Sequence, residues 1–138
     1  MSIYSLTQND GASDLTITTA GMIICEVIED LDGMTAVTLA FRLAYGSGGT
    51  SVKAYVQTSL DQGNIWIDIA TIAFFTVSEH QVVNLSGLTP KTTPVTPSDG
   101  ALTDDTCVDG VLGDRLRTKI VITGTYANTV LAVRASVR

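Results

Sequence analysis

The chain is short of charged residues, histidine and cysteine. Of its 138 residues, 16 % are charged, and it contains one histidine and two cysteines. Since an average domain has roughly 25 % charged residues, this composition is typical of a domain that is nearly all β or partly covered by partners. Two cysteines and one histidine give no zinc-binding spacing. The glycine-rich stretch 46–49 lacks the lysine and helix of a phosphate-binding loop. We therefore expect no cofactor and no bound metal ion.

The sequence also shows no sign of a targeting or membrane-spanning segment. The first ten residues lack both a basic start and an apolar core. No apolar run approaches the roughly 20 residues that span a bilayer. We expect a protein that is made in a cytoplasm and has no membrane partner.

Basic residues are few and unevenly placed. The formal net charge is −6, yet residues 111–138 hold five of the eight basic residues and one of the fourteen acidic ones. Because duplex nucleic acid is bound by clustered Lys and Arg, we expect no nucleic-acid partner. Arg115, Arg117 and Lys119 alternate along one predicted strand and form a basic face. This face either lies beside acidic strands of the same fold or meets an acidic face of another copy of the protein.

Helical periodicity is nearly absent, whereas period-two segments rich in Thr, Val and Ile recur along the chain. They predict eight strands, at residues 14–20, 22–29, 34–45, 51–59, 65–72, 79–85, 115–123 and 130–137. This pattern favours an all-β fold, an antiparallel two-sheet sandwich that is jelly-roll-like, with an immunoglobulin-like sandwich as the alternative. We place a single domain at residues 14–138 and an N-terminal arm at residues 1–13.

All three prolines lie in one long loop, residues 86–114, between the sixth and seventh predicted strands. Proline fixes φ and removes a backbone donor, so this loop should be extended and should not join a central strand. Its apolar residues need something to bury against. The loop either packs over its own sandwich or acts as an arm on a neighbouring subunit. The proposed arm residues are Leu88, Pro90, Pro94, Val95, Pro97, Leu102, Val108, Val111 and Leu112.

The stretch SLDQGNIW, residues 59–66, has the frame of the Asp-box, a motif of sialidases and related folds. In that frame the aspartate accepts backbone hydrogen bonds, the glycine takes a positive φ and the tryptophan packs on the hairpin. The motif occurs once here, and a chain of this length cannot form a propeller of several blades. We interpret it as a structural turn made by Ser59, Asp61, Gly63 and Trp66.

Candidate catalytic residues carry no local signature. A Cys107–His80 pair is conceivable, but nothing around either residue marks a nucleophile and its base. Cys25 lies in an apolar run that is typical of a buried cysteine. The sequence leaves open whether the two cysteines form a disulfide. We expect that the protein is not an enzyme.

A group of carboxylates near the end of the long loop is a second candidate. Asp104, Asp105, Asp109 and Asp114 lie within one short run. Oxygen ligands of this kind could hold Ca²⁺, but the spacing is not that of an EF-hand. We interpret the run as a solvated acidic loop.

Three stretches of the chain carry a resemblance. They are the hairpin YVQTSLDxGxxWIDIA, the loop LTPKTTPVTPSDG and the stretch LGDRLR, and the similarity that they carry covers roughly residues 51–123. They resemble small structural proteins encoded among the virion genes of tailed bacteriophages. The resemblance implies a non-enzymatic component of the virion with a β-sandwich fold.

Many small jelly-roll proteins of this kind are capsid cement or decoration proteins, which stabilise the phage head by bridging neighbouring capsid subunits. The resemblance thus implies the major capsid protein and copies of the chain itself as partners, in a homo-oligomer, either a dimer or a trimer. A position at the neck, portal or tail is the alternative. A carbohydrate-binding module is a further alternative, with Trp66, Tyr55 and Tyr45 as the sugar platform.

Overall fold

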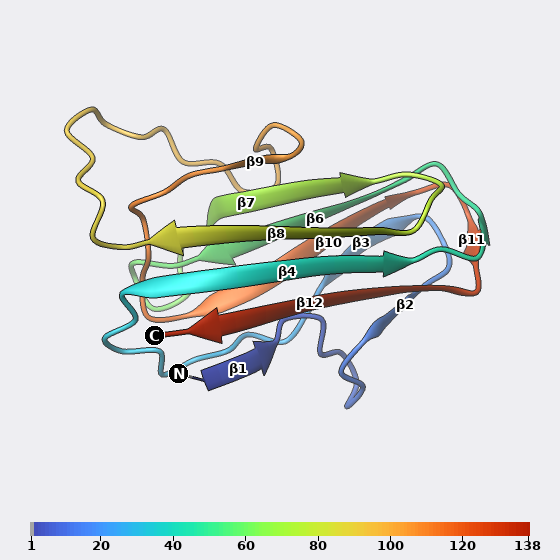
Figure 1. Ribbon diagram of the computed structural model, residues 1–138, viewed down its shortest axis with the longest axis horizontal. Coiled ribbons are helices and arrows are strands. Elements are labelled where there is room, and N and C mark those ends of the chain that lie inside the picture. Colours follow the sequence, from blue (N-terminus) through green and yellow to red (C-terminus); the bar gives the residue numbers. More distant parts are fainter. Residues whose placement is uncertain (1) are drawn as a thin grey trace.

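The computed structural model describes residues 2–138, which form twelve β-strands (Figure 1). All strand pairs are antiparallel. Over these residues there is no helix that could cross a membrane. The predicted all-β fold is confirmed.

Ten of the strands form two sheets of five. The first consists of β1 (Ser2–Ser5), β12 (Thr129–Val137), β4 (Ala36–Ala44) and β8 (Glu79–Ser86) in that order, and β2 (Leu15–Ile17) also pairs with β12. The second consists of β3 (Gly21–Ile24), β10 (Leu116–Thr123), β6 (Ser51–Thr58), β7 (Ile67–Phe74) and β9 (Thr106–Cys107). The short strands β5 (Ser47–Gly48) and β11 (Tyr126–Ala127) pair with each other.

Eight of the strands pair in a nested order. β2 pairs with β12, β3 with β10, β4 with β8, and β6 with β7. Two further ladders, β4 with β12 and β6 with β10, complete the sheets. Of these eight strands, the first along the chain therefore pairs with the last, the second with the second to last, and so on inward to β6 and β7.

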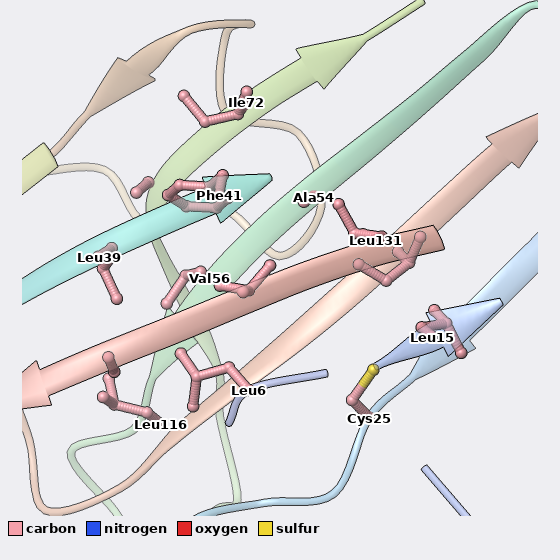
Figure 2. Packing of buried hydrophobic residues seen from close by; sticks show 14 of the residues in the cluster. Leu6, Leu15, Cys25, Leu39, Phe41, Ala54, Val56, Ile72, Leu116 and Leu131 are labelled. Atoms are coloured by element: carbon pink, nitrogen blue, oxygen red, sulfur yellow. The ribbon is translucent and has the colours of Figure 1, made fainter. Parts of the chain in front are cut away.

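One hydrophobic core lies between the two sheets (Figure 2). Leu39 and Phe41 of β4 face it from the first sheet, and Ala54 and Val56 of β6 face it from the second; all four are fully buried. Because side chains alternate across a strand, the period-two pattern of the sequence already separates these residues from their outward neighbours. Burying a side chain of the size of Leu or Phe contributes roughly 1.5–3 kcal/mol, so this core is the main source of stability.

Each of the eight predicted strands overlaps an observed one, and the observed strands β1, β5, β9 and β11 were not predicted. These four have only two to four residues. Alternation cannot be recognised in so short a segment, and their pairing is set by neighbours that are distant in sequence.

The predicted N-terminal arm is instead part of the sandwich. Residues 2–5 form β1, which pairs with β12. Leu6 and Thr7 are fully buried, and Leu6 N donates to Val133 O at 2.8 Å. Met1, the first residue of that predicted arm, lies outside the described residues. The domain therefore begins well before residue 14.

Candidate interaction site

The long loop between β8 and β10 divides into two parts. Residues 98–114 return beside the second sheet, where β9 pairs with the edge of β7. Nearly all of residues 88–97 are exposed, and none belongs to a strand. Figure 1 shows the chain leaving the end of β8, running outside the sandwich and coming back beside β7. We call residues 88–97 the free tract and residues 98–114 the docked tract.

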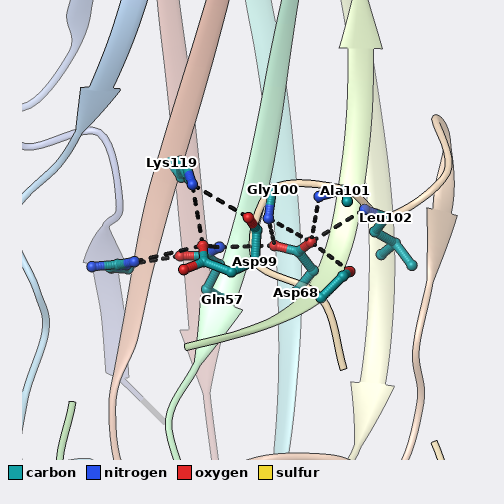
Figure 3. A network of polar contacts seen from close by, with 9 residues as sticks. Gln57, Asp68, Asp99, Gly100, Ala101, Leu102 and Lys119 are labelled. Carbon is teal, nitrogen blue, oxygen red and sulfur yellow. Dashed lines mark hydrogen bonds and ion pairs between the residues drawn. The ribbon is translucent and has the colours of Figure 1, made fainter. Parts of the chain in front are cut away.

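Asp68 of β7 holds the start of the docked tract (Figure 3). Its side chain points away from the core and is covered by the loop, so the residue is 2 % exposed. The backbone N–H of Asp68 also donates to Ser98 O at 2.8 Å. The carboxylate accepts hydrogen bonds from Gln57 Nε2 at 2.8 Å, Ser98 Oγ at 2.9 Å, Gly100 N at 2.8 Å, Ala101 N at 3.0 Å and Leu102 N at 3.2 Å.

These contacts keep the Asp68 carboxylate ionised. Burial by itself raises the pKa of Asp68, but the hydrogen bonds from Gln57 and from the loop outweigh it, and the net pKa is lowered from its ordinary value. A carboxylate that accepts several N–H bonds is a strong fastening point because each bond is charge-assisted. The loop is therefore bound to the sheet through one buried negative charge.

Asp99 adds a second layer of contacts above Asp68. Its carboxylate lies 3.3 Å from Lys119 Nζ and 3.8 Å from Arg117 Nη2, and it accepts a hydrogen bond from Gln57 Nε2 at 2.6 Å. Arg117 Nε donates to Gln57 Oε1 at 2.8 Å, and its guanidinium lies 4.3 Å from the centre of the Trp66 ring. Sheet and loop thus share one connected polar network.

This network accounts for the predicted basic face. Arg117 and Lys119 are paired with Asp99 of the docked tract, and Arg115 forms ion pairs with Glu29 and Asp114, each at 3.3 Å. The first of the two interpretations, pairing with acidic residues of the same fold, describes all three. In this structure their charges are directed at their own chain.

Asp109 closes the base of the free tract. Its carboxylate accepts hydrogen bonds from Ser86 N at 2.7 Å, Thr89 Oγ1 at 2.9 Å and Gly110 N at 3.0 Å. The N–H of Ser86 and then the hydroxyl of Thr89 are the main causes that lower the pKa of Asp109. Since Gly110 N also donates to Ser86 O at 3.0 Å, the start of the free tract is held at a fixed position.

The free tract itself presents apolar side chains to solvent. Leu88 is 75 % exposed and Val95 is 37 % exposed. The three prolines, Pro90, Pro94 and Pro97, are exposed as well. Proline restricts the backbone to extended conformations, so the tract is an extended segment of limited freedom between two fixed ends.

The other proposed arm residues lie in the docked tract. Leu102, Val108, Val111 and Leu112 are half-buried, and Leu112 packs against the core of its own chain. Val108 N donates to Ile69 O at 2.8 Å. As arm residues, these four were expected to contact another molecule. They lie instead beside their own sandwich, because the carboxylates of Asp68 and Asp109 fasten the loop there.

The turn at residues 59–66 has the geometry of its motif. Asp61 Oδ1 accepts hydrogen bonds from Ile65 N at 2.8 Å and from Ser59 Oγ at 3.0 Å, and Gly63 N donates to Ser59 Oγ at 2.8 Å. Gly63 has a φ of 88°, which favours glycine. Trp66 is 8 % exposed and closes the hairpin beneath Arg117. These polar groups therefore hydrogen-bond to one another within the turn.

The three aromatic residues named for a sugar platform do not form one. Trp66 and Tyr55 are buried, and Arg117 covers the Trp66 ring. Tyr45 is half-buried and makes an edge-to-face contact with Tyr126, with ring centres 6.0 Å apart. A sugar-binding platform needs exposed ring faces, which these residues lack.

The cysteine and the histidine of the conceivable catalytic pair lie in different sheets. Cys107 lies in β9 of the second sheet and is exposed, whereas His80 lies in β8 of the first. Cys25 is buried and free. Burial, with a smaller effect from Glu26, raises the pKa of the Cys25 thiol to about 11, so that the thiol stays protonated and unreactive at neutral pH.

The carboxylates of the acidic run have separate partners. Asp104 pairs with Lys53 at 3.1 Å, Asp105 accepts a hydrogen bond from Ala73 N at 3.1 Å, and Asp114 pairs with Arg115. Between Ser2 and Arg138, no three His, Cys, Asp or Glu side chains are grouped closely enough to hold a metal ion. The run fastens the loop rather than forming one site.

Gln57, Asp68 and Asp99 were not singled out from the sequence, and Asp109 was named only as a member of the acidic run. Two of them carried a usable signal: Gln57 and Asp68 are polar residues at outward positions of strands 51–59 and 65–72, which are otherwise rich in apolar side chains. A buried outward-facing carboxylate needs a cover, and the loop is that cover.

Comparison of the chain with family models, curated proteins and solved structures gave no match.

Proposed function

We propose that the protein is a non-enzymatic structural component of a bacteriophage virion, a capsid cement or decoration protein that bridges neighbouring major capsid subunits. One observation carries the proposal: the free tract presents Leu88 and Val95 to solvent from a backbone that is fixed at both ends. Exposed apolar residues on a fixed extended segment suit a contact with another molecule.

The physical advantage of this arrangement is preorganisation. A loose loop loses conformational freedom when it binds, and that loss subtracts from the affinity. Here Asp109 fixes one end of the free tract, Asp68 and Ser98 fix the other, and three prolines restrict the chain between them. An oligomer that binds several equivalent positions of a shell at once needs only a small contact area at each, because the linked contacts reinforce one another.

The sandwich that carries the tract is, in our proposal, a jelly roll. The nested pairing of β2 with β12, β3 with β10, β4 with β8 and β6 with β7 supports it. An antiparallel hairpin wrapped into two sheets gives this order, which matches an eight-stranded jelly roll. Such a closed body provides a rigid support for the tract.

Binding to purified heads tests the proposal. Heads lacking the protein are incubated with the purified chain and sedimented. Replacing both Leu88→Asp and Val95→Asp should weaken binding at least about tenfold, since charges would enter an apolar contact. The matched control is Leu60→Asp with Ile65→Asp, which alters two exposed apolar residues on the turn and should leave binding unchanged.

Equal binding by the native chain and the Leu88/Val95 variant would contradict the proposal. Labelled protein seen by electron microscopy decides the position: a cement protein covers the shell, whereas a neck or portal protein appears at one vertex. Label on tails alone would favour the tail alternative.

A further inference from the structure

The free side of β8 is the longest open edge of the molecule. β8 has eight residues and pairs with β4 in continuous register, from Ala36 opposite Ser86 to Leu43 opposite Glu79. Within the described part of the chain, no strand pairs with its other side. The other edge strands are shorter: β1 and β3 have four residues each, β2 has three and β9 has two.

The direction of the backbone groups along β8 follows from the bonds at its end. Gly87 N donates to Thr35 O at 2.7 Å across the ladder with β4. Ser86 directs its groups the other way, because its N–H donates to Asp109 and its carbonyl accepts from Gly110 N. Since N–H and C=O alternate in direction along a strand, the even-numbered residues His80, Val82 and Asn84 point theirs to the free side.

Nothing on this edge opposes pairing with another strand. Native edges are usually blunted by lysine, proline, bulges or short length. The segment His80–Asn84 contains no lysine, no proline and no bulge. Val82 is 58 % exposed. Only the Ser86 end is closed, by Asp109 and Gly110, so the open window runs from residue 80 to residue 84.

We propose that a second copy of the chain occupies this window, with the two β8 strands antiparallel and a two-fold axis at Val82. The window fixes the register, because Asp109 blocks any shift toward Ser86. Each Val82 then faces its counterpart, and each His80 faces Asn84 of the other copy. The two first sheets become one continuous sheet through the dimer.

Self-pairing in this register provides hydrogen-bond partners for the backbone groups on the free side of β8. Every outward N–H and C=O of His80, Val82 and Asn84 gains a backbone partner. The exposed Val82 side chains cover each other, and pairs of β-branched residues across antiparallel strands are favourable. Glu79 is the one carboxylate in β8, and it falls opposite Leu85 of the other copy. No like charges therefore meet across the pair, so this edge is complementary to itself.

Hydrogen exchange on the native chain tests the pairing. In a dimer at about 100 µM, the amides of His80, Val82 and Asn84 should exchange slowly, and dilution should make them exchange fast. The amides of Gln81 and Val83 bond to β4 and should stay slow at both concentrations. A monomer at 100 µM, or a dimer in which the three amides exchange fast, would overturn the inference.

The substitution Val82→Pro removes the outward N–H and no bond to β4. Proline is tolerated in an edge strand where its N–H would face solvent. We expect a dimer dissociation constant weakened about tenfold or more, since each copy loses a bond at the two-fold axis. Val82→Thr keeps the backbone groups and should keep the dimer. Equal dimerisation of the native chain and the proline variant would refute the proposed edge. Both measurements use the isolated chain, so their outcome is independent of head binding.

Discussion

The two parts of the long loop differ in what holds them. Both belong to residues 88–114, and both contain spaced apolar residues. The docked tract is fastened through Asp68 and by the pairing of β9 with β7, whereas the free tract is held only at its ends. The difference shows that carboxylates, rather than apolar content, decide which part of this loop belongs to the fold.

The largest effect should come from removing the Asp68 carboxylate. Asp68→Ala leaves three successive loop amides without their acceptor and removes one of the two acceptors of Gln57 Nε2. Because unpaired buried donors are costly, we expect the free energy of unfolding to fall by about 3 kcal/mol. Urea denaturation measures it, and hydrogen exchange at Gly100 and Leu102 should become fast. Asp104→Ala, which breaks the solvent-exposed ion pair with Lys53, is the control and should cost less than about 1 kcal/mol. Equal losses in the two variants would contradict the role of Asp68.

Acid should act on the same anchor. The pKa of Asp68 is lower in the folded chain than its ordinary value, so its ionisation stabilises the fold above the unfolded pKa of about 3.9. That contribution is lost as the pH falls from there through the lower folded pKa. We expect stability to decline as the pH falls below about 5, and the stability of Asp68→Asn to decline less steeply. Parallel pH profiles of the native chain and the variant would show that Asp68 is not the responsible group.

A smaller effect should follow from Arg117→Ala. The substitution removes the contact over Trp66 and the bond to Gln57, which together are worth roughly 1–2 kcal/mol. Lys119→Ala removes only the contacts with Asp99 and should cost no more than about 1 kcal/mol. Thermal denaturation ranks the two variants. A larger loss for Lys119→Ala would mean that Asp99, and not the Trp66–Arg117 stack, connects the loop to the sheet.

The smallest effect on stability should come from the free tract. Leu88→Ser changes a residue that makes little contact with its own chain, so the free energy of unfolding should stay within about 0.5 kcal/mol of the native value. Denaturation in urea checks this. A loss above 1 kcal/mol would show that Leu88 is part of the fold and would remove the distinction between the two tracts.

Much of the fold could be predicted from the sequence because alternation is a local signal. The strand at residues 51–59 was recognised from Val52, Ala54 and Val56 on one face, and the structure places all three in the core. The short strand β9 could not be recognised, since two residues show no alternation and its partner β7 lies more than 30 residues earlier in the chain.

The loop was harder to predict for a different reason. Its prolines correctly indicated an extended segment outside the strands, but they do not say where the loop lies. Its position depends on Asp68, whose effect on the loop appears only when Ser98 and Gly100 reach it in three dimensions. The N-terminal segment was misjudged in the same way, because β1 acquires its partner β12 from the other end of the chain.

The most direct test of the division of the loop into a free tract and a docked tract compares amide hydrogen exchange in the free chain with exchange in the chain bound to heads. We predict that the amides of residues 100–102 exchange slowly in both states, and that those of residues 91–93 and 95–96 slow down only on heads. Fast exchange at residues 91–96 on heads, or equally fast exchange at residues 100–102 in the free chain, would contradict it.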